Sequence, residues 1–135
     1  MEHQDIWKKA AGFVRRYPLG LLCVALIWYL SLWVTVPETP LDDVAFVDKW
    51  THLVMYGGTC AVVWCEHLRS HARPRWGRLL LLAVAGMVVM GGAIELLQEY
   101  TTADRSGEWL DFAADTVGVV AGAVVGLAVW RWRRA

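Results

Sequence analysis

Four long apolar stretches constrain most strongly what this chain can fold into. They cover 18–36, 47–65, 79–98 and 112–130 of the 135 residues, and 57% of all residues are hydrophobic. About 20 apolar residues are needed to cross a bilayer core of ~30 Å. A small soluble core would not bury this much apolar sequence. The sequence therefore predicts an all-α membrane protein, a polytopic bundle of four transmembrane helices.

The positions of the basic residues predict how the helices are oriented. Although the net charge is zero, nearly all Lys and Arg residues precede the first stretch, connect the second and third, or follow the fourth. The positive-inside rule places these segments, and both termini, in the cytoplasm. We divide the chain into a juxtamembrane segment (1–17), a transmembrane domain (18–131) and a cytoplasmic tail (132–135). The first segment is either a short amphipathic helix on the inner leaflet or a solvated tail.

Polar residues gather at the opposite, outer ends of three predicted helices. In the second helix, Asp48, His52 and Tyr56 recur at i, i+4 and i+8, so they share one face. Ionisable groups are expensive within a membrane and usually mark a working site or an obligatory pairing. The predicted pocket consists of Asp48, Lys49, His52, Tyr56, Glu95, Gln98, Arg105, Asp111 and Asp115.

A ridge of small residues follows two of these carboxylates. Gly118, Gly122 and Gly126 recur every four residues along the fourth helix, directly after Asp111 and Asp115. Such a ridge lets another helix approach closely. The sequence thus predicts that the face that packs is also the face that carries the carboxylates. Glu108, which precedes this helix, is expected to be solvated at the outer surface.

The polar residues, in this order and at these helix ends, resemble the signature of the VanZ-like family of small bacterial membrane proteins. The similarity covers about 47–126, from the Asp48–Lys49 pair through Glu95 and Arg105 to Gly118. It implies a multi-pass protein of the bacterial inner (cytoplasmic) membrane. The members that give the family its name lower susceptibility to glycopeptide antibiotics of the teicoplanin type. The resemblance implies no particular reaction.

Charge favours binding as the function of the predicted pocket. Four carboxylates face only two permanent cations, Lys49 and Arg105, so the cluster is acidic and would repel a bare phosphate group. We expect a cationic or hydrogen-bonding ligand, such as an amine on a lipid-linked cell-wall precursor or on a glycopeptide. The protein would then contribute to envelope precursor handling or glycopeptide tolerance. Membrane lipids are expected partners and nucleic acids are not. Whether the protein forms a homo-oligomer is left open by the sequence.

Three alternatives remain at this point. The first is metal-assisted or acid–base hydrolysis of a lipid-linked substrate, with His52, Glu95 and Asp111 as candidate ligands of a divalent metal. The second is proton-linked transport, and the third is a polar clasp that only fixes the helix register. No catalytic residue is assigned, and an enzyme is the less favoured reading.

Overall fold

The computed structural model describes residues 2–34, 40, 46–101, 103 and 108–135. The elements in this part of the chain are all helical, which confirms the all-α prediction. They are α1 (Glu2–Arg16), α2 (Pro18–Leu32), α3 (Val47–Ser70), α4 (Trp76–Leu80), the π-helical segment η1 (Leu81–Ala85), α5 (Gly86–Thr101) and α6 (Trp109–Arg134).

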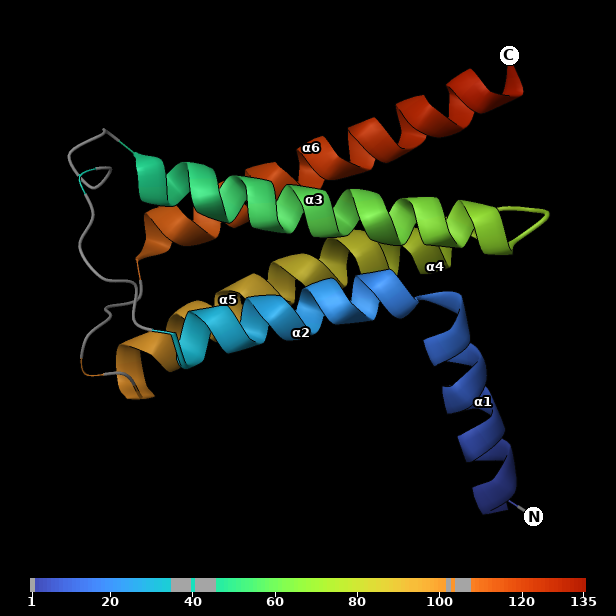
Figure 1. The fold of residues 1–135 in the computed structure, drawn as a ribbon, viewed down its shortest axis with the longest axis horizontal. Coiled ribbons are helices and arrows are strands. Elements are labelled where there is room, and N and C mark those ends of the chain that lie inside the picture. Colours follow the sequence, from blue (N-terminus) through green and yellow to red (C-terminus); the bar gives the residue numbers. More distant parts are fainter. Residues whose placement is uncertain (1, 35–39, 41–45, 102, 104–107) are drawn as a thin grey trace.

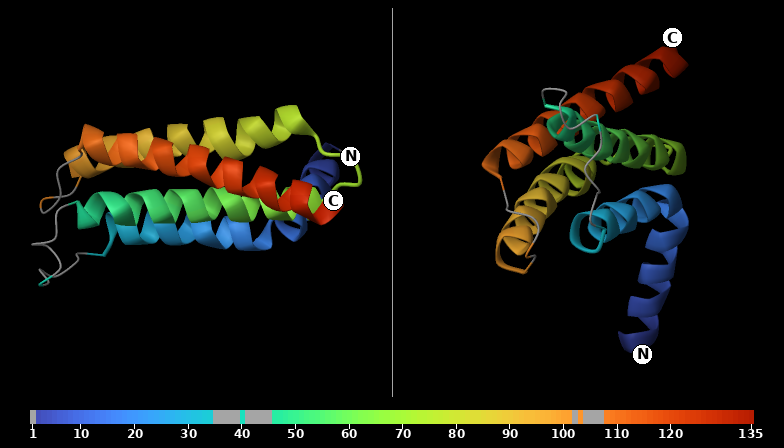
Figure 2. Two further views of the ribbon diagram at one scale, coloured as in Figure 1. Left: turned by 90° about the horizontal axis from the view of Figure 1, so that it is seen from above. Right: turned by 60° about the vertical axis from the view of Figure 1, so that its left-hand side comes forward.

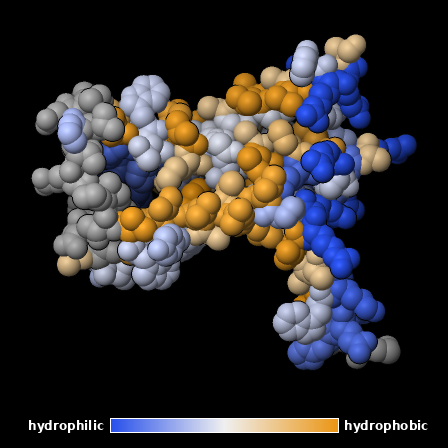
Figure 3. Space-filling view, in the orientation of Figure 1, coloured by the Kyte–Doolittle hydropathy of each residue, from blue (hydrophilic) through white to orange (hydrophobic). Residues whose placement is uncertain are grey.

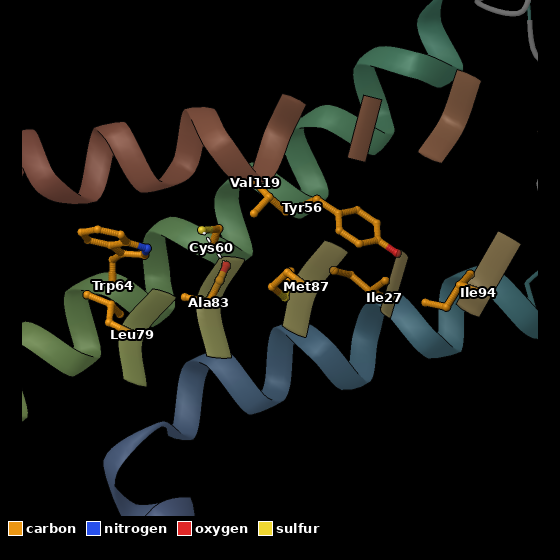
Figure 4. Packing of buried hydrophobic residues seen from close by; sticks show 9 residues of the cluster. All are labelled: Ile27, Tyr56, Cys60, Trp64, Leu79, Ala83, Met87, Ile94 and Val119. Carbon is orange, nitrogen blue, oxygen red and sulfur yellow. Dashed lines mark hydrogen bonds between the residues drawn. The ribbon is translucent and has the colours of Figure 1, made fainter. Parts of the chain in front are cut away.

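Four helices form a bundle in which each has two principal neighbours. Helix α3 packs against α2 and α6, and α5 closes the ring by packing against the same two helices. The buried core includes Ile27 of α2, Tyr56 and Cys60 of α3, Met87 of α5 and Val119 of α6 (Figure 4). All four helices therefore contribute one face to a single core.

Among the residues that the structure describes, fewer helices than the predicted four are long and apolar enough to cross a membrane. Two helices are long and apolar enough, 76–101 (α4, η1 and α5 taken together) and α6, and α1 with α2 makes a third if that bent pair is one span. Helix α3 is not among them, and its sequence carries polar residues such as His52 and His67 and charged residues near both ends. The four-span count and the positions of the termini stay predictions.

A sharp bend separates α1 from α2. The two helices meet at 88°, and Figure 1 shows α1 leaving the bundle. Pro18 opens α2, where its missing N–H is harmless, and it disfavours the helical conformation for Tyr17 before it. The Tyr17 hydroxyl lies 2.6 Å from His67 Nδ1 on α3, which ties the bend to the bundle. The structure shows a helix over Glu2–Arg16, and its position on the inner leaflet stays a prediction.

The closest helix contact joins α6 to α3. A Cβ atom added at Gly118 would overlap the Leu53 carbonyl oxygen, and one added at Gly122 would overlap the carbonyl oxygen of Gly57. Gly126 meets Trp64 in the same way. Because the paired residue numbers rise together, α3 and α6 run parallel, and the three glycines set their register.

Hydropathy differs along the bundle. Figure 3 shows an apolar surface over the middle of the bundle and hydrophilic residues at the end where α6 finishes. That end carries Arg69 of α3 and Arg131, Arg133 and Arg134 of α6, all exposed. Exposed apolar residues on the flanks include Leu22, Val89 and Val124. This distribution suits helices that cross a membrane with their basic ends on one side.

Candidate functional site

The polar site lies at the bundle end opposite the arginines. The N-terminal turns of α3 and α6 meet the C-terminal turns of α5 there, since His52 contacts Asp115 and the Glu108 backbone contacts Glu95. Residues four apart along a helix share a face, which stacks Asp111 above Asp115 on α6. The structure thus brings polar residues from three helices to one end of the bundle.

Lys49 organises the outer layer of the site. Its ammonium nitrogen lies 2.6 Å from an Asp48 oxygen, 2.7 Å from a Glu108 oxygen and 2.5 Å from Asp111 Oδ1. The ammonium donates hydrogen bonds to Asp48 and Glu108 and forms an ion pair with Asp111, so three carboxylates already surround it. Lys49 is therefore not available to neutralise the carboxylates deeper in the site. Glu108, expected to be merely solvated, is one of its partners.

His52 and Asp115 form the inner layer. Asp115 is fully buried, and its Oδ1 lies 2.9 Å from His52 Nδ1. His52 Nε2 lies 3.9 Å from Asp111 Oδ2, which is too far for a hydrogen bond. The imidazole is thus oriented by Asp115, and its second nitrogen lies on the side of Asp111.

Glu95 completes the inner layer from α5. The residue is only 7% exposed, and its Oε2 accepts a hydrogen bond of 3.0 Å from the Glu108 backbone N–H. Glu95 Oε1 and Asp115 Oδ2 are buried without a hydrogen-bond partner in the described part of the chain. Nearly all buried polar atoms in proteins are satisfied, so two such oxygens point to a missing proton, water or cation.

Gly91 makes room for this inner layer. A Cβ atom at this position of α5 would lie 3.0 Å from Asp115 Oδ2 and 3.3 Å from Cε1 of Tyr56. The absence of a side chain at Gly91 therefore lets the Asp115 carboxylate approach the α5 backbone. Tyr56 is itself almost fully buried and belongs to the apolar cluster of Figure 4 more than to the polar site.

The remaining predicted residues have different surroundings. Gln98 is buried and donates a 2.9 Å hydrogen bond to the Ser31 carbonyl, so it links α5 to α2. Arg105 lies outside the described residues. Sequence reasoning missed Ser31, because an acceptor on the backbone leaves no signature in residue type. It also missed the role of Glu108, although its position just before the first turn of α6 offered a signal.

The inner layer offers a possible ligand set for a metal ion. One ligand atom each from His52, Glu95 and Asp115 lies within 4.8 Å of the other two. The predicted set contained Asp111 in place of Asp115. In the structure Asp111 belongs to an outer group with Asp48 and Glu108, and the Lys49 ammonium contacts all three of these carboxylates.

Comparison with known proteins gives no further guide. No protein-family model, curated protein or solved structure matches the chain. The resemblance to the VanZ-like family therefore rests on the quoted residues and stays a prediction.

Proposed function

We propose that this protein is a four-span membrane protein of the VanZ-like kind, with cytoplasmic termini and the polar site open to the envelope side of the bacterial inner membrane. The separation of charge along the bundle supports this topology. Arginines collect at one end of α3 and α6, and carboxylates at the other. Cationic ends are retained in the cytoplasm.

The site binds a cationic group, and this binding contributes to envelope precursor handling or glycopeptide tolerance of the teicoplanin type. The observation that carries the proposal is the pair of buried, unpartnered carboxylate oxygens on Glu95 and Asp115. Each unsatisfied buried group costs about 1–3 kcal/mol, and more when it is charged. A bound ammonium group or divalent cation would remove this cost, so the site favours a ligand with positive charge.

A purely structural clasp accounts for only the outer layer. The ion pairs of Lys49 with Asp48, Glu108 and Asp111 are complete in themselves and can fix the register of α3 and α6. A clasp gives no reason to bury a second pair of carboxylates beneath them. The inner layer is thus the part of the site to which we assign binding.

Metal-assisted hydrolysis is the second candidate function. It is favoured by the proximity of His52, Glu95 and Asp115, since one imidazole and two carboxylates can bind a divalent ion and leave a position for water. An ion held by these residues would supply an activated water for hydrolysis of a lipid-linked substrate. Proton-linked transport gains no comparable support from the contacts.

The decisive experiment compares the purified wild-type protein with Glu95→Gln by native mass spectrometry and elemental analysis. Asp5→Asn is the matched control, because Asp5 is an exposed carboxylate on α1, outside the site. We expect wild type and Asp5→Asn to retain an amine-bearing lipid-linked precursor or a stoichiometric divalent metal, and Glu95→Gln to lose it. Retention of neither by wild type, after exposure to both, would contradict the proposal.

A metal would favour the hydrolytic candidate, and a precursor without metal would favour binding alone. If a metal is found, hydrolysis of the precursor by wild type but not by His52→Ala would establish the second function. Circular dichroism and gel filtration of each variant verify that the fold is retained.

A further inference from the structure

A cavity lies at the basic end of the bundle, far from the polar site. Its volume is about 790 Å³, and most of its lining residues come from the C-terminal parts of α3 and α6. The two helices are in close contact up to Gly126, and in Figure 1 and the right view of Figure 2 the C-terminal part of α6 then leaves α3. The cavity occupies the space that opens between them.

Three arginines give this cavity a positive rim. Arg69 of α3 and Arg133 and Arg134 of α6 line it, and none of them pairs with a carboxylate among the residues that the structure describes. The cavity also has a carboxylate, Glu66, but this group is already engaged. Its two oxygens accept the α2 backbone N–H groups of Leu19 and Gly20, at 2.8 and 2.9 Å. The rim therefore carries three cations against one carboxylate, and that carboxylate is held by α2, so the rim is positive overall.

The wall of the cavity is apolar. Ala61 and Val62 of α3 and Val129 of α6 line it within the hydrophobic part of the helices. Trp130 stands between this wall and the rim, with the Arg134 guanidinium 4.5 Å from its ring centroid. A cavity with an apolar wall and an arginine rim fits an amphiphile that has a negative head group and an acyl chain. A small hydrophilic anion would leave the apolar wall empty.

We infer that this cavity binds one anionic phospholipid, with its phosphate at Arg69, Arg133 and Arg134 and an acyl chain along Ala61, Val62 and Val129. Basic pockets between membrane helices on the cytoplasmic side bind anionic lipid head groups through such contacts. The guanidinium group suits phosphate because its planar donors can engage two oxygens at once. This inference is independent of the ligand at the polar site, since the two sites share no residue.

The test is a titration of the purified protein in detergent with phosphatidylglycerol and phosphatidylcholine of the same acyl chains, followed by native mass spectrometry. We expect one phosphatidylglycerol to bind at least about tenfold more tightly than phosphatidylcholine, and Arg69→Gln/Arg133→Gln to weaken its binding about 30-fold. The control Arg15→Gln/Arg16→Gln removes the same charge from α1 and should keep the wild-type affinity.

A second pair of variants tests the apolar wall without changing charge. Ala61→Trp fills the cavity and should reduce phosphatidylglycerol binding, whereas Val54→Trp, at an exposed position of α3 outside the cavity, should not. These two also decide the matter if the arginine variant does not fold. Equal binding of both lipids, equal losses in both double-arginine variants, or full displacement of the lipid by excess inorganic phosphate would overturn the inference.

Discussion

Gly122→Ala tests the contact that sets the register of α6 on α3. The new methyl group would overlap the Gly57 carbonyl oxygen and lie 2.9 Å from Cys60 Cβ. A backbone oxygen cannot rotate away, so α6 would have to move away from α3. A gap of about 0.5–1 Å between the two helices loses about a quarter to a half of the energy of each van der Waals contact. Overpacking typically costs about 1–3 kcal/mol, and the better helix propensity of Ala returns about 1 kcal/mol. We expect a net destabilisation of about 1 kcal/mol, and up to about 2 kcal/mol where α6 cannot adjust.

The assay is unfolding of the purified protein in mixed micelles, followed by circular dichroism. Gly58→Ala is the matched control. Gly58 lies on α3, in the same helix pair, and a Cβ atom there would meet nothing within 4 Å. This variant should keep the stability of wild type or gain up to about 1 kcal/mol. Equal stability of Gly122→Ala and Gly58→Ala would refute the glycine contact as the determinant of register.

Three further predictions concern the two ends of the bundle. Glu95→Gln should leave the unfolding temperature of the ligand-free protein unchanged or raise it. The amide removes a buried charge, yet its oxygen can still accept the hydrogen bond from the Glu108 N–H. A clear decrease of the unfolding temperature in chelator-treated samples would contradict this. Lys49→Met should destabilise the protein by about 3 kcal/mol in the same micelle assay, because buried Asp111 loses its ion pair. A smaller loss of stability than in Asp48→Asn would contradict this prediction. Glu66→Gln should cost about 1 kcal/mol by weakening the N-terminal cap of α2, and unchanged thermal stability would argue against that cap.

The sequence by itself determined where the helices lie and which bundle end carries which charge. The predicted stretches at 47–65, 79–98 and 112–130 fall inside helices of the structure, and 18–32 of the first stretch is α2. These features depend on local composition, because helix length follows the apolar run and side chains four apart share a face. The sequence also predicted that Glu95 lies near Asp111 and Asp115. This follows because successive helices run in opposite directions, which brings the end of one helix beside the start of the next.

Only the tertiary structure decided which polar residues become partners. Helices α3 and α6 run parallel, and the contacts of Gly118 with Leu53 and of Gly122 with Gly57 fix their relative height. This register places Asp115 beside His52 and leaves Asp111, one turn further out, to pair with Lys49. Hydrophobic periodicity shows which face of a helix is buried but not its offset along a neighbour, and that offset is set by steric contact between two distant parts of the chain.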